Sequence, residues 1–263
     1  MNQSEVVYDG AGSHRHFVQF YKADEPALNR NVSGFLWDGL LRGDGLLVIA
    51  TAQRRESLSS HLARLGADVA LARREGQLAM LDAAEMLSRF MVDGQPHPER
   101  FQAAVDEALQ FARPRAAEAG ICAYGEMVGI LWEAGQTTAA IRLEEFWNQL
   151  LREGGISLFC GYPIDIFADS FERTHIHDVL CAHTHVLPTG GDGDLGAALD
   201  RAMDELLGTA ADEVRSSMNA GLPASNLAMP AAESAILWLR SHVPENAETI
   251  LARARNYYEA RAQ

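Results

Sequence analysis

Short, almost continuously apolar runs alternate with longer amphipathic stretches along most of this chain. The apolar runs cover residues 16–20, 45–51, 78–81, 120–124 and 156–161. Such runs are typical of strands that are buried on both faces of a parallel sheet. We therefore expect each run to form one strand of a single, mainly parallel sheet.

The stretches between these runs carry apolar residues at helical spacing. They cover residues 26–41, 54–65, 83–92, 98–111 and 137–150. We expect Gly66 and Gly94 to end the second and third helices and Thr137 to cap the last one. The alternation of strands and helices predicts a three-layer α/β fold with helices on both faces of the sheet.

The composition changes at residues 187–194, which read LPTGGDGD and have the Pro and Gly content of a linker. We expect a flexible N-terminus at 1–11, an α/β domain at 12–188, a linker at 189–194 and an all-helical region at 195–263. Helices are predicted in that last region at 195–220, 230–242 and 245–262. Its first apolar stripe either forms a homodimer interface or folds back on the α/β domain; the stripe contains Leu195, Leu199, Met203, Leu206 and Leu207.

The net charge and the cysteine content limit the classes of binding partner and the cellular compartment that we expect. The net charge of −14 argues against a surface for nucleic acid or for an anionic membrane. The three cysteines form no C-x-x-C pair and are consistent with reduced thiols. Residues 1–12 lack the apolar core of a signal peptide, and no apolar run is long enough to span a bilayer. We expect a cytoplasmic protein that binds neither nucleic acid nor membrane.

The turn after the first predicted strand lacks the chemistry of a phosphate loop. Such a loop needs glycines followed by Lys and Ser or Thr, because its backbone N–H groups must curl around the phosphates. Residues 21–26 read YKADEP, with no glycine and with two acids where the phosphate charge would lie. Lys22 is either a relic of a phosphate-binding lysine or, as we expect, an ordinary solvated lysine. We predict no ATP hydrolysis and no cofactor.

Polar and aromatic side chains gather where the predicted strands end, which is where open α/β sheets bind ligands. These residues are Tyr21, Thr51, Asp82, Glu126, Cys160 and Tyr162. Glu126 either belongs to a ligand-binding or polar network or caps the helix that follows it. Cys160 is either a nucleophile beside a histidine or an inert thiol, and its apolar neighbours favour the inert thiol.

Two further groups of polar residues lie on predicted helices. Glu144 and Asn148 are four residues apart and share a helix face, where they bind either a ligand or a neighbouring turn. A second group has the composition of a metal site; it contains His175, His177, Asp178, Cys181, His183 and His185. We expect this second group to lie on a solvated helix, so no metal is predicted.

Several dispersed segments resemble one family of sensory domains. They read HFVQFY (16–21), LLRGDGLLVIAT (40–51), LARLGADV (62–69), GQLAMLDAAEMLSRFMVDGQP (76–96), YGEMVGILWEAGQ (124–136), LEEFWNQL (143–150) and LFCGYPIDIF (158–167). Over roughly residues 14–188 the chain is similar to the MEDS family, named for methanogens, methylotrophs and the dichloromethane-responsive regulator. The family signature at the first strand is His-x-Cys-x-x-Tyr. His16 and Tyr21 match it, whereas Val18 stands in place of the Cys.

The resemblance implies a RecA-like α/β sandwich and a ligand-sensing role upstream of two-component or transcriptional output. We therefore expect a sensory module without enzymatic activity that binds an unknown small organic ligand. Its helical tail would signal to a protein partner such as a kinase or a regulator. The candidate ligand-binding residues are His16, Tyr21, Thr51, Asp82, Glu126, Glu144, Asn148, Cys160 and Tyr162. A divergent nucleotide-binding enzyme and a pure protein-interaction adaptor are the alternatives.

Overall fold

The computed structural model describes residues 15–22, 25–115, 118–190, 193–221 and 229–261. The N-terminus expected to be flexible (1–11) lies outside the described residues. So do Ala23 and Asp24 of the turn after the first strand, and residues 191–192 of the expected linker.

A six-stranded, all-parallel sheet forms the centre of the molecule, in the order β3-β2-β6-β7-β1-β8. Its strands are β1 (Arg15–Phe20), β2 (Gly45–Ala50), β3 (Leu78–Asp82), β6 (Ile121–Gly125), β7 (Ile156–Tyr162) and β8 (His185–Leu187). The apolar runs therefore predicted every strand except β8, which adds three residues to the edge beside β1.

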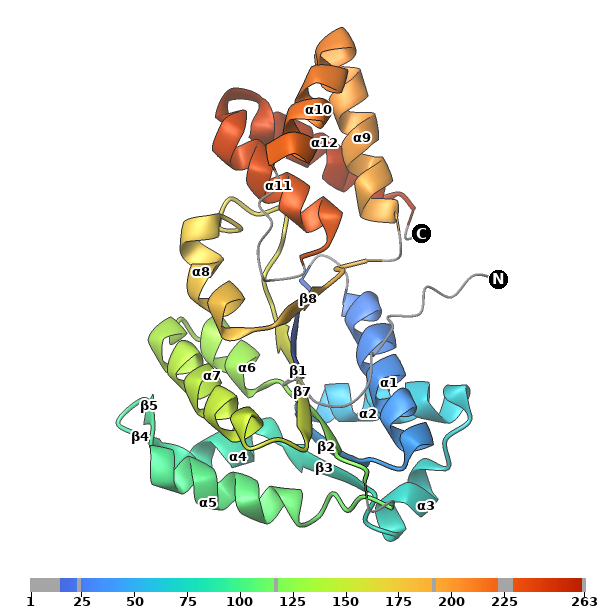
Figure 1. Cartoon of the computed structure of the whole chain (residues 1–263), viewed down its shortest axis with the longest axis vertical. Helices are drawn as coiled ribbons and strands as arrows, with labels where there is room; N and C mark the ends of the chain where they lie inside the picture. The colour runs from blue at the N-terminus through green and yellow to red at the C-terminus, as the bar shows by residue number, and fades with distance from the viewer. Residues whose placement is uncertain (1–14, 23–24, 116–117, 191–192, 222–228, 262–263) are drawn as a thin grey trace.

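Helices cover both faces of the sheet, so the predicted α/β fold is confirmed (Figure 1). One face carries α1 (Glu25–Arg42), α2 (Ala52–Leu65) and α3 (Val69–Arg74). The other face carries α4 (Ala83–Phe90), α5 (Pro98–Leu109), α6 (Met127–Glu133), α7 (Thr137–Arg152) and α8 (Arg173–Ala182). Strand residues alternate between two apolar cores, one beneath each helical layer.

The register between β1 and β7 decides which side chains meet. His16 is paired with Leu158, and Val18 with Cys160. Since alternate residues of a strand point to opposite faces, Val18 and Cys160 share the face that α7 covers. His16 lies two residues before Val18 and points to the same face.

The C-terminal helices pack together beyond α8 and β8 (Figure 1). They are α9 (Asp194–Leu207), a short 3-10 helix η1 (Gly208–Ala210), α10 (Ala211–Gly221), α11 (Ala231–His242) and α12 (Pro244–Glu259). The single helix predicted at 195–220 is wrong, because the chain breaks it at Gly208, where φ is +54°. Leu195, Leu199 and Met203 belong to the same buried core as α7 and α8, so this stripe folds back on the chain.

Two local predictions fail for identifiable reasons. The helix expected at 83–92 ends at Phe90, and the chain continues into a hairpin of β4 (Met91–Val92) and β5 (Gln95–Pro96). Gly94, with a φ of +75°, lies in the turn of that hairpin instead of ending a helix. Thr137 is the first residue of α7 and does not cap it, because Gln136 holds the N-cap position. Gly66 does end α2 as predicted, with a φ of +107°.

Within the described residues, every helix is too short or too polar to cross a bilayer.

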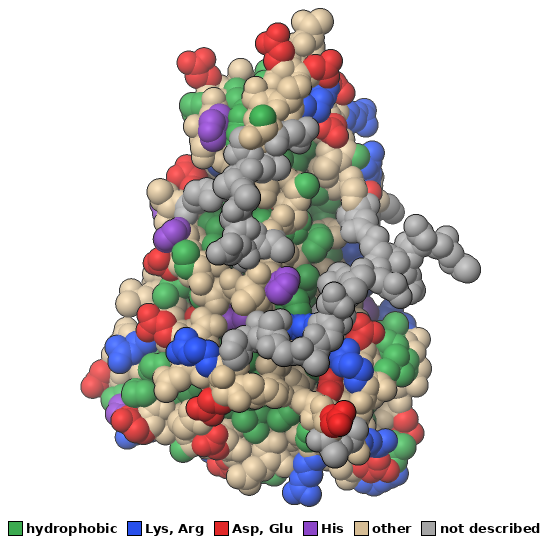
Figure 2. Space-filling model, viewed as in Figure 1, with side chains coloured by type: hydrophobic (Ala, Val, Ile, Leu, Met, Phe, Trp, Pro, Cys, Tyr) green, Lys and Arg blue, Asp and Glu red, His purple; other side chains and the backbone are tan. Residues whose placement is uncertain are grey.

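On the face shown in Figure 2, Lys and Arg side chains are interspersed with Asp and Glu side chains.

Candidate functional site

The structure gathers most of the candidate residues into two polar clusters, one on each face of the sheet and each around a buried carboxylate. On the α7 face lies the Glu144 cluster, which contains His16, Glu144, Asn148, Cys160, Tyr162 and His183. On the α1 face lies the Glu126 cluster, which contains Tyr21, Thr51, Arg54, Tyr124 and Glu126. Asp82 belongs to neither cluster: it caps α4 by accepting from Ala84 N and Glu85 N, and it pairs with Arg55.

The Glu144 carboxylate is the centre of its cluster and is fully buried. Tyr162 donates its hydroxyl to Glu144 Oε1 over 2.8 Å. Nε2 of His16 lies 3.2 Å from Oε2, and Nε2 of His183 lies 3.3 Å from Oε1. The Cys160 sulfur lies 3.7 Å from Oε2 and 3.4 Å from the His16 ring. Glu144 therefore joins two strands, a helix and the residue that follows α8.

The second nitrogen of each imidazole faces a carbonyl oxygen. His16 Nδ1 lies 3.0 Å from Ala182 O, and His183 Nδ1 lies 2.6 Å from Val179 O. Asn148 supports His16 with Oδ1 at 3.0 Å from the same Nδ1, and it donates its own Nδ2 to Ala182 O. Because a carbonyl oxygen only accepts, both rings carry their proton on Nδ1 and direct Nε2 at the carboxylate.

Burial and mutual attraction set the ionisation of this cluster. Burial alone would raise the pKa of Glu144, but His183 and His16 hold that pKa well below its usual range. Burial, reinforced by the Glu144 carboxylate, raises the pKa of Cys160 and of Tyr162 well above their ordinary values. Burial and repulsion from His16 lower the pKa of His183. The result favours an ionised carboxylate beside a protonated thiol and a protonated phenol, and burial with a raised pKa is typical of an unreactive thiol.

In the Glu126 cluster, one carboxylate is saturated by fixed donors. Glu126 Oε2 accepts from Thr51 N at 2.9 Å and from Thr51 Oγ1 at 3.0 Å, and Oε1 accepts from Arg54 Nε at 2.7 Å. Arg54 also donates to Asn29 and Glu25 and stacks over the Tyr21 ring. Glu126 occupies the N-cap position of α6, but its side chain makes no cap hydrogen bond. Of the two alternatives for Glu126, the structure therefore supports the polar network.

The Arg54 charge dominates the Glu126 cluster. Burial would lower the pKa of Arg54, but Tyr124, Glu126 and Glu25 raise it overall. Burial, followed by the Glu126 carboxylate, raises the pKa of Tyr21 and of Tyr124. The Glu126 carboxylate is therefore balanced by a cation that belongs to the same cluster.

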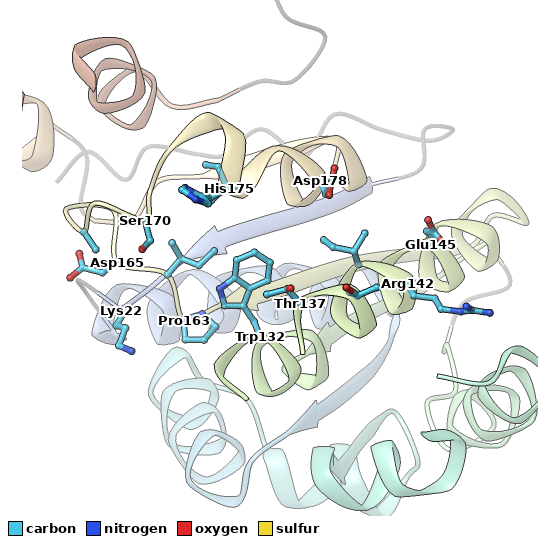
Figure 3. Close-up of a pocket in the computed structure, with 15 residues that line it drawn as sticks. Lys22, Trp132, Thr137, Arg142, Glu145, Pro163, Asp165, Ser170, His175 and Asp178 are labelled. Atoms are coloured by element: carbon cyan, nitrogen blue, oxygen red, sulfur yellow. The ribbon is translucent and has the colours of Figure 1, made fainter. Parts of the chain in front are cut away.

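A pocket of about 800 Å³ opens at the carboxyl ends of β1 and β7, between α8 and the pair α6–α7 (Figure 3). Its apolar lining comes from Trp132, Ile141, Pro163, Ile164, Ala168 and Ile176, and its polar lining from Lys22, Thr137, Thr138, Arg142, Glu145, Asp165, Ser170, His175 and Asp178. The place is the one predicted for a ligand, but the wall residues are different from the candidates. Sequence reasoning missed them because Trp132 and Ile141 have the spacing of ordinary core residues.

One aromatic contact connects this pocket to the Glu144 cluster. The Trp132 ring, which lines the pocket, meets the Tyr162 ring edge to face, with centroids 5.5 Å apart. Tyr162 in turn donates to Glu144. Tyr162 therefore contacts both Trp132 of the pocket wall and the buried Glu144 carboxylate.

The histidine-rich segment at 175–185 divides among several environments, and His185 lies on β8 against the Phe17 ring. His175 lines the pocket, and His183 is buried in the Glu144 cluster. His177 and Cys181 stay on the exposed side of α8, with the sulfur 3.5 Å from the ring. Only part of this segment is therefore the solvated helix face that we expected. His183 shows no sequence signal that separates it from its neighbours.

At the position where a phosphate loop would lie, the structure describes the residues on either side of Ala23 and Asp24. Lys22 is exposed, lines the pocket and lies 4.0 Å from Glu133. Glu25, the first residue of α1, binds Arg54. Lys22 and Glu25 therefore each have a charged partner outside this turn.

Comparison with known proteins identifies the domain that holds both clusters. The family model described as MEDS, the MEthanogen/methylotroph, DcmR Sensory domain, matches residues 15–184. No curated protein and no solved structure matches the chain. The matched residues run from β1 through α8 and make up more than half of the chain. The chain therefore belongs to the MEDS family of sensory domains.

Proposed function

We propose that this chain is a signalling module that binds a small organic molecule in the pocket between α7 and α8 and reports its presence through the C-terminal helices. The observation that carries this proposal is the position of the segment 163–171. Residues of this segment line the pocket, and residues of the same segment form hydrogen bonds and an ion pair with α11 and α12.

The contacts of that segment with the C-terminal helices are specific. Arg240 of α11 donates to Phe171 O at 2.6 Å and to Phe167 O at 3.1 Å. Arg255 of α12 pairs with Asp165, and the Phe167 ring meets Tyr258 of the same helix. A ligand that displaces Asp165 or Ala168 would therefore move groups that the tail helices hold.

The pocket lining indicates the chemical class of the ligand. Trp132, Ile141 and Ile176 offer an apolar wall, and Thr137 and Ser170 offer hydroxyls. Cations and carboxylates both occur in the lining, so no single charge is favoured. We infer an uncharged or zwitterionic molecule with an apolar body, of a size that suits a volume of about 800 Å³.

In this proposal the domain signals and does not catalyse, and it needs no cofactor for recognition. Its output partner would be a protein of a two-component or transcriptional pathway, such as a kinase or a regulator. The cytoplasmic location and the homodimer stay predictions, and the burial of Leu199 and Met203 leaves less of the tail available for a dimer interface.

Ligand binding is tested by filling the pocket. Native mass spectrometry of freshly purified protein, followed by thermal-shift screening of small organic molecules, supplies the ligand. Ala168→Trp places an indole in the pocket, and the matched control Ala63→Trp places one on the exposed face of α2. We expect the first variant to lose binding and the second to keep it. Equal binding by both variants, or no binding by the wild type across the screen, would reject the proposed pocket. ATP and Mg²⁺ in the same screen test the nucleotide-binding alternative.

Transmission is tested by hydrogen exchange in the presence and absence of that ligand. We expect the ligand to slow amide exchange in α11 and α12 of the wild type. Arg240→Met should keep ligand binding but weaken this protection, whereas Arg253→Met, which removes only the Arg253–Glu205 pair, should leave it intact. Protection confined to α7 and α8 would contradict signalling through the tail.

A further inference from the structure

Four side chains of the Glu144 cluster converge as a ligand set. They are His16 on β1, Glu144 on α7, Cys160 on β7 and His183 after α8, and we call them the four-ligand cluster. All are buried, and their ligand atoms lie within 4.8 Å of one another. They come from four separate parts of the chain, so only the tertiary fold brings them together.

Hydrogen bonding inside this set is incomplete. Nδ1 of both rings faces a carbonyl, so Nε2 presents a lone pair to the carboxylate wherever the ring carries a single proton. Two acceptors that face each other repel unless a proton or another cation lies between them. His183 Nε2 is fully buried and, although it lies 3.3 Å from Glu144 Oε1, it forms no hydrogen bond within the described residues. An unpartnered buried nitrogen costs about 1–3 kcal/mol, so its presence here requires an explanation.

The charge of the set is also unbalanced. The side chains that contact the Glu144 carboxylate in the described structure are those of His16, His183, Cys160 and Tyr162. None of them carries a permanent positive charge, whereas Arg54 supplies one to Glu126. A buried carboxylate without a fixed cation is expensive unless a cation comes from outside the chain.

The ligand-atom separations around His16, Cys160 and Glu144 are close to those of a tetrahedral metal site. Bonds of about 2.0–2.3 Å to nitrogen, oxygen and sulfur place neighbouring ligand atoms roughly 3.3–3.7 Å apart. His16 Nε2 lies 3.2 Å from Oε2 and 3.4 Å from the sulfur, and the sulfur lies 3.7 Å from Oε2. His183 Nε2 lies 3.3 Å from the other carboxylate oxygen, Oε1, and the four ligand atoms all lie within 4.8 Å of one another. The carbonyls behind each Nδ1 and the Asn148 amide form the outer shell that orients metal-bound histidines.

We propose that the four-ligand cluster is a closed binding site for a divalent transition metal, with zinc as the best-matched ion. Two nitrogens, one sulfur and one oxygen form a donor set that zinc accepts in tetrahedral geometry. On binding, Cys160 releases its thiol proton to solvent, and the thiolate and the Glu144 carboxylate together balance the two positive charges of the ion. The buried site becomes neutral, and both Nε2 lone pairs gain a partner.

All four ligand positions come from the protein, so this site is suited to structure and not to catalysis. The ion would join β1, β7, α7 and the end of α8. Since α8 forms one wall of the pocket, metal occupancy would fix that wall. The inference does not depend on the identity of the pocket ligand.

Cobalt provides the sharpest test. The full chain is freed of metal with a chelator, its fold is checked by circular dichroism, and Co²⁺ is added in steps. We expect one Co²⁺ per chain, visible bands of tetrahedral cobalt and a near-ultraviolet charge-transfer band from thiolate to cobalt. Zinc should displace the cobalt and abolish these bands.

Variants assign the ligands. Cys160→Ser should lose the charge-transfer band and weaken binding on the order of 100-fold, and His183→Gln should weaken it similarly. Asn148→Ala should weaken binding by roughly 10–100-fold through the outer shell. The matched control Cys181→Ser removes the exposed thiol beside His177 and should behave like the wild type.

Two results would overturn the proposal. The first is a folded, metal-free wild type that binds neither Co²⁺ nor Zn²⁺ at tenfold excess. The second is a charge-transfer band that survives Cys160→Ser and disappears in Cys181→Ser. The first result is measured on the wild type alone, so it decides the proposal even if a ligand variant fails to fold.

Discussion

The Glu144 and Glu126 clusters each hold a buried carboxylate, but different kinds of side chain surround it. Each places a carboxylate that is at most 4% exposed beneath a helical layer of the same sheet. Glu126 is neutralised by Arg54, with Nε at 2.7 Å, and receives two further hydrogen bonds from Thr51. Glu144 is surrounded by two imidazoles, a thiol and a phenol, and each of these groups can gain or lose a proton.

The groups around the two carboxylates differ in how they respond to the solution. A guanidinium keeps its charge at every accessible pH, so we expect the Glu126 cluster to keep one charge arrangement. Imidazole and thiol groups can exchange protons and bind metals, so we expect the Glu144 cluster to be the more sensitive of the two. It is also the cluster that adjoins the pocket, through Trp132 and Tyr162.

The largest expected effect comes from removing the cation of the Glu126 cluster. Arg54→Met leaves Glu126 buried without its cation, and we expect the free energy of unfolding to fall by about 3–5 kcal/mol. Urea unfolding measures this change. Arg54→Met combined with Glu126→Leu should recover much of the loss, because no buried charge remains.

Arg55→Met is the control for that experiment. It removes the half-exposed pair of Arg55 with Asp82 and should cost only about 0–1 kcal/mol. Similar losses for Arg54→Met and Arg55→Met would show that the Glu126 cluster is not held by its internal cation.

A matched pair of tyrosine variants gives an intermediate effect. Tyr162→Phe removes the 2.8 Å hydrogen bond to Glu144, and we expect a loss of about 1.5–3 kcal/mol in metal-free protein. Tyr124→Phe removes a hydroxyl 3.4 Å from Glu126, which has stronger donors, and should cost less than about 1 kcal/mol. Chemical denaturation of both variants under the same conditions tests the order, and a reversed order would contradict the difference between the clusters.

The smallest effect concerns a third buried carboxylate, Glu233 of α11, which accepts from Thr189 N at 2.7 Å. Burial raises its pKa above the ordinary 4.5, although the Thr189 backbone opposes the shift. The folded state therefore holds this proton more tightly than the unfolded state. Its contribution to stability is complete below pH 4.5 and is lost as the pH rises through the folded pKa.

Glu233→Gln removes that titration. We expect the melting temperature of the variant, relative to the wild type, to increase as the pH is raised from about 4 to 7. Thermal unfolding at several pH values measures it. A difference between variant and wild type that does not change with pH would rule out a raised pKa at Glu233.

The strands and the main helices of the α/β domain were predictable because their apolar patterns are local. The three-residue strand β8 was not, because it forms only through pairing with β1. The hairpin after Phe90 was also missed, since Met91 and Val92 continue the helical pattern of α4.

The candidate sites were predictable in part. Strand-end placement brought Tyr21, Thr51 and Glu126 into one cluster, because the carboxyl ends of parallel strands share an edge. The same placement did not predict that Cys160 and Tyr162 point to the opposite face or that Asp82 caps α4. The convergence of His16, Glu144 and Cys160 depends on β7 lying beside β1, and local patterns do not contain the order of strands. His183 reaches the cluster only because the chain turns back after α8.

The pairing of Val18 with Cys160 has a consequence for how the family signature is understood. The two positions are lateral neighbours, about one strand spacing of 4.8 Å apart, and point the same way. The Cys160 sulfur of β7 thus lies beside the position where the signature has its cysteine, and 3.4 Å from the His16 ring. The surroundings of His16 are built by two adjacent strands, so residues of β1 and β7 have to be considered together when the signature is compared between proteins.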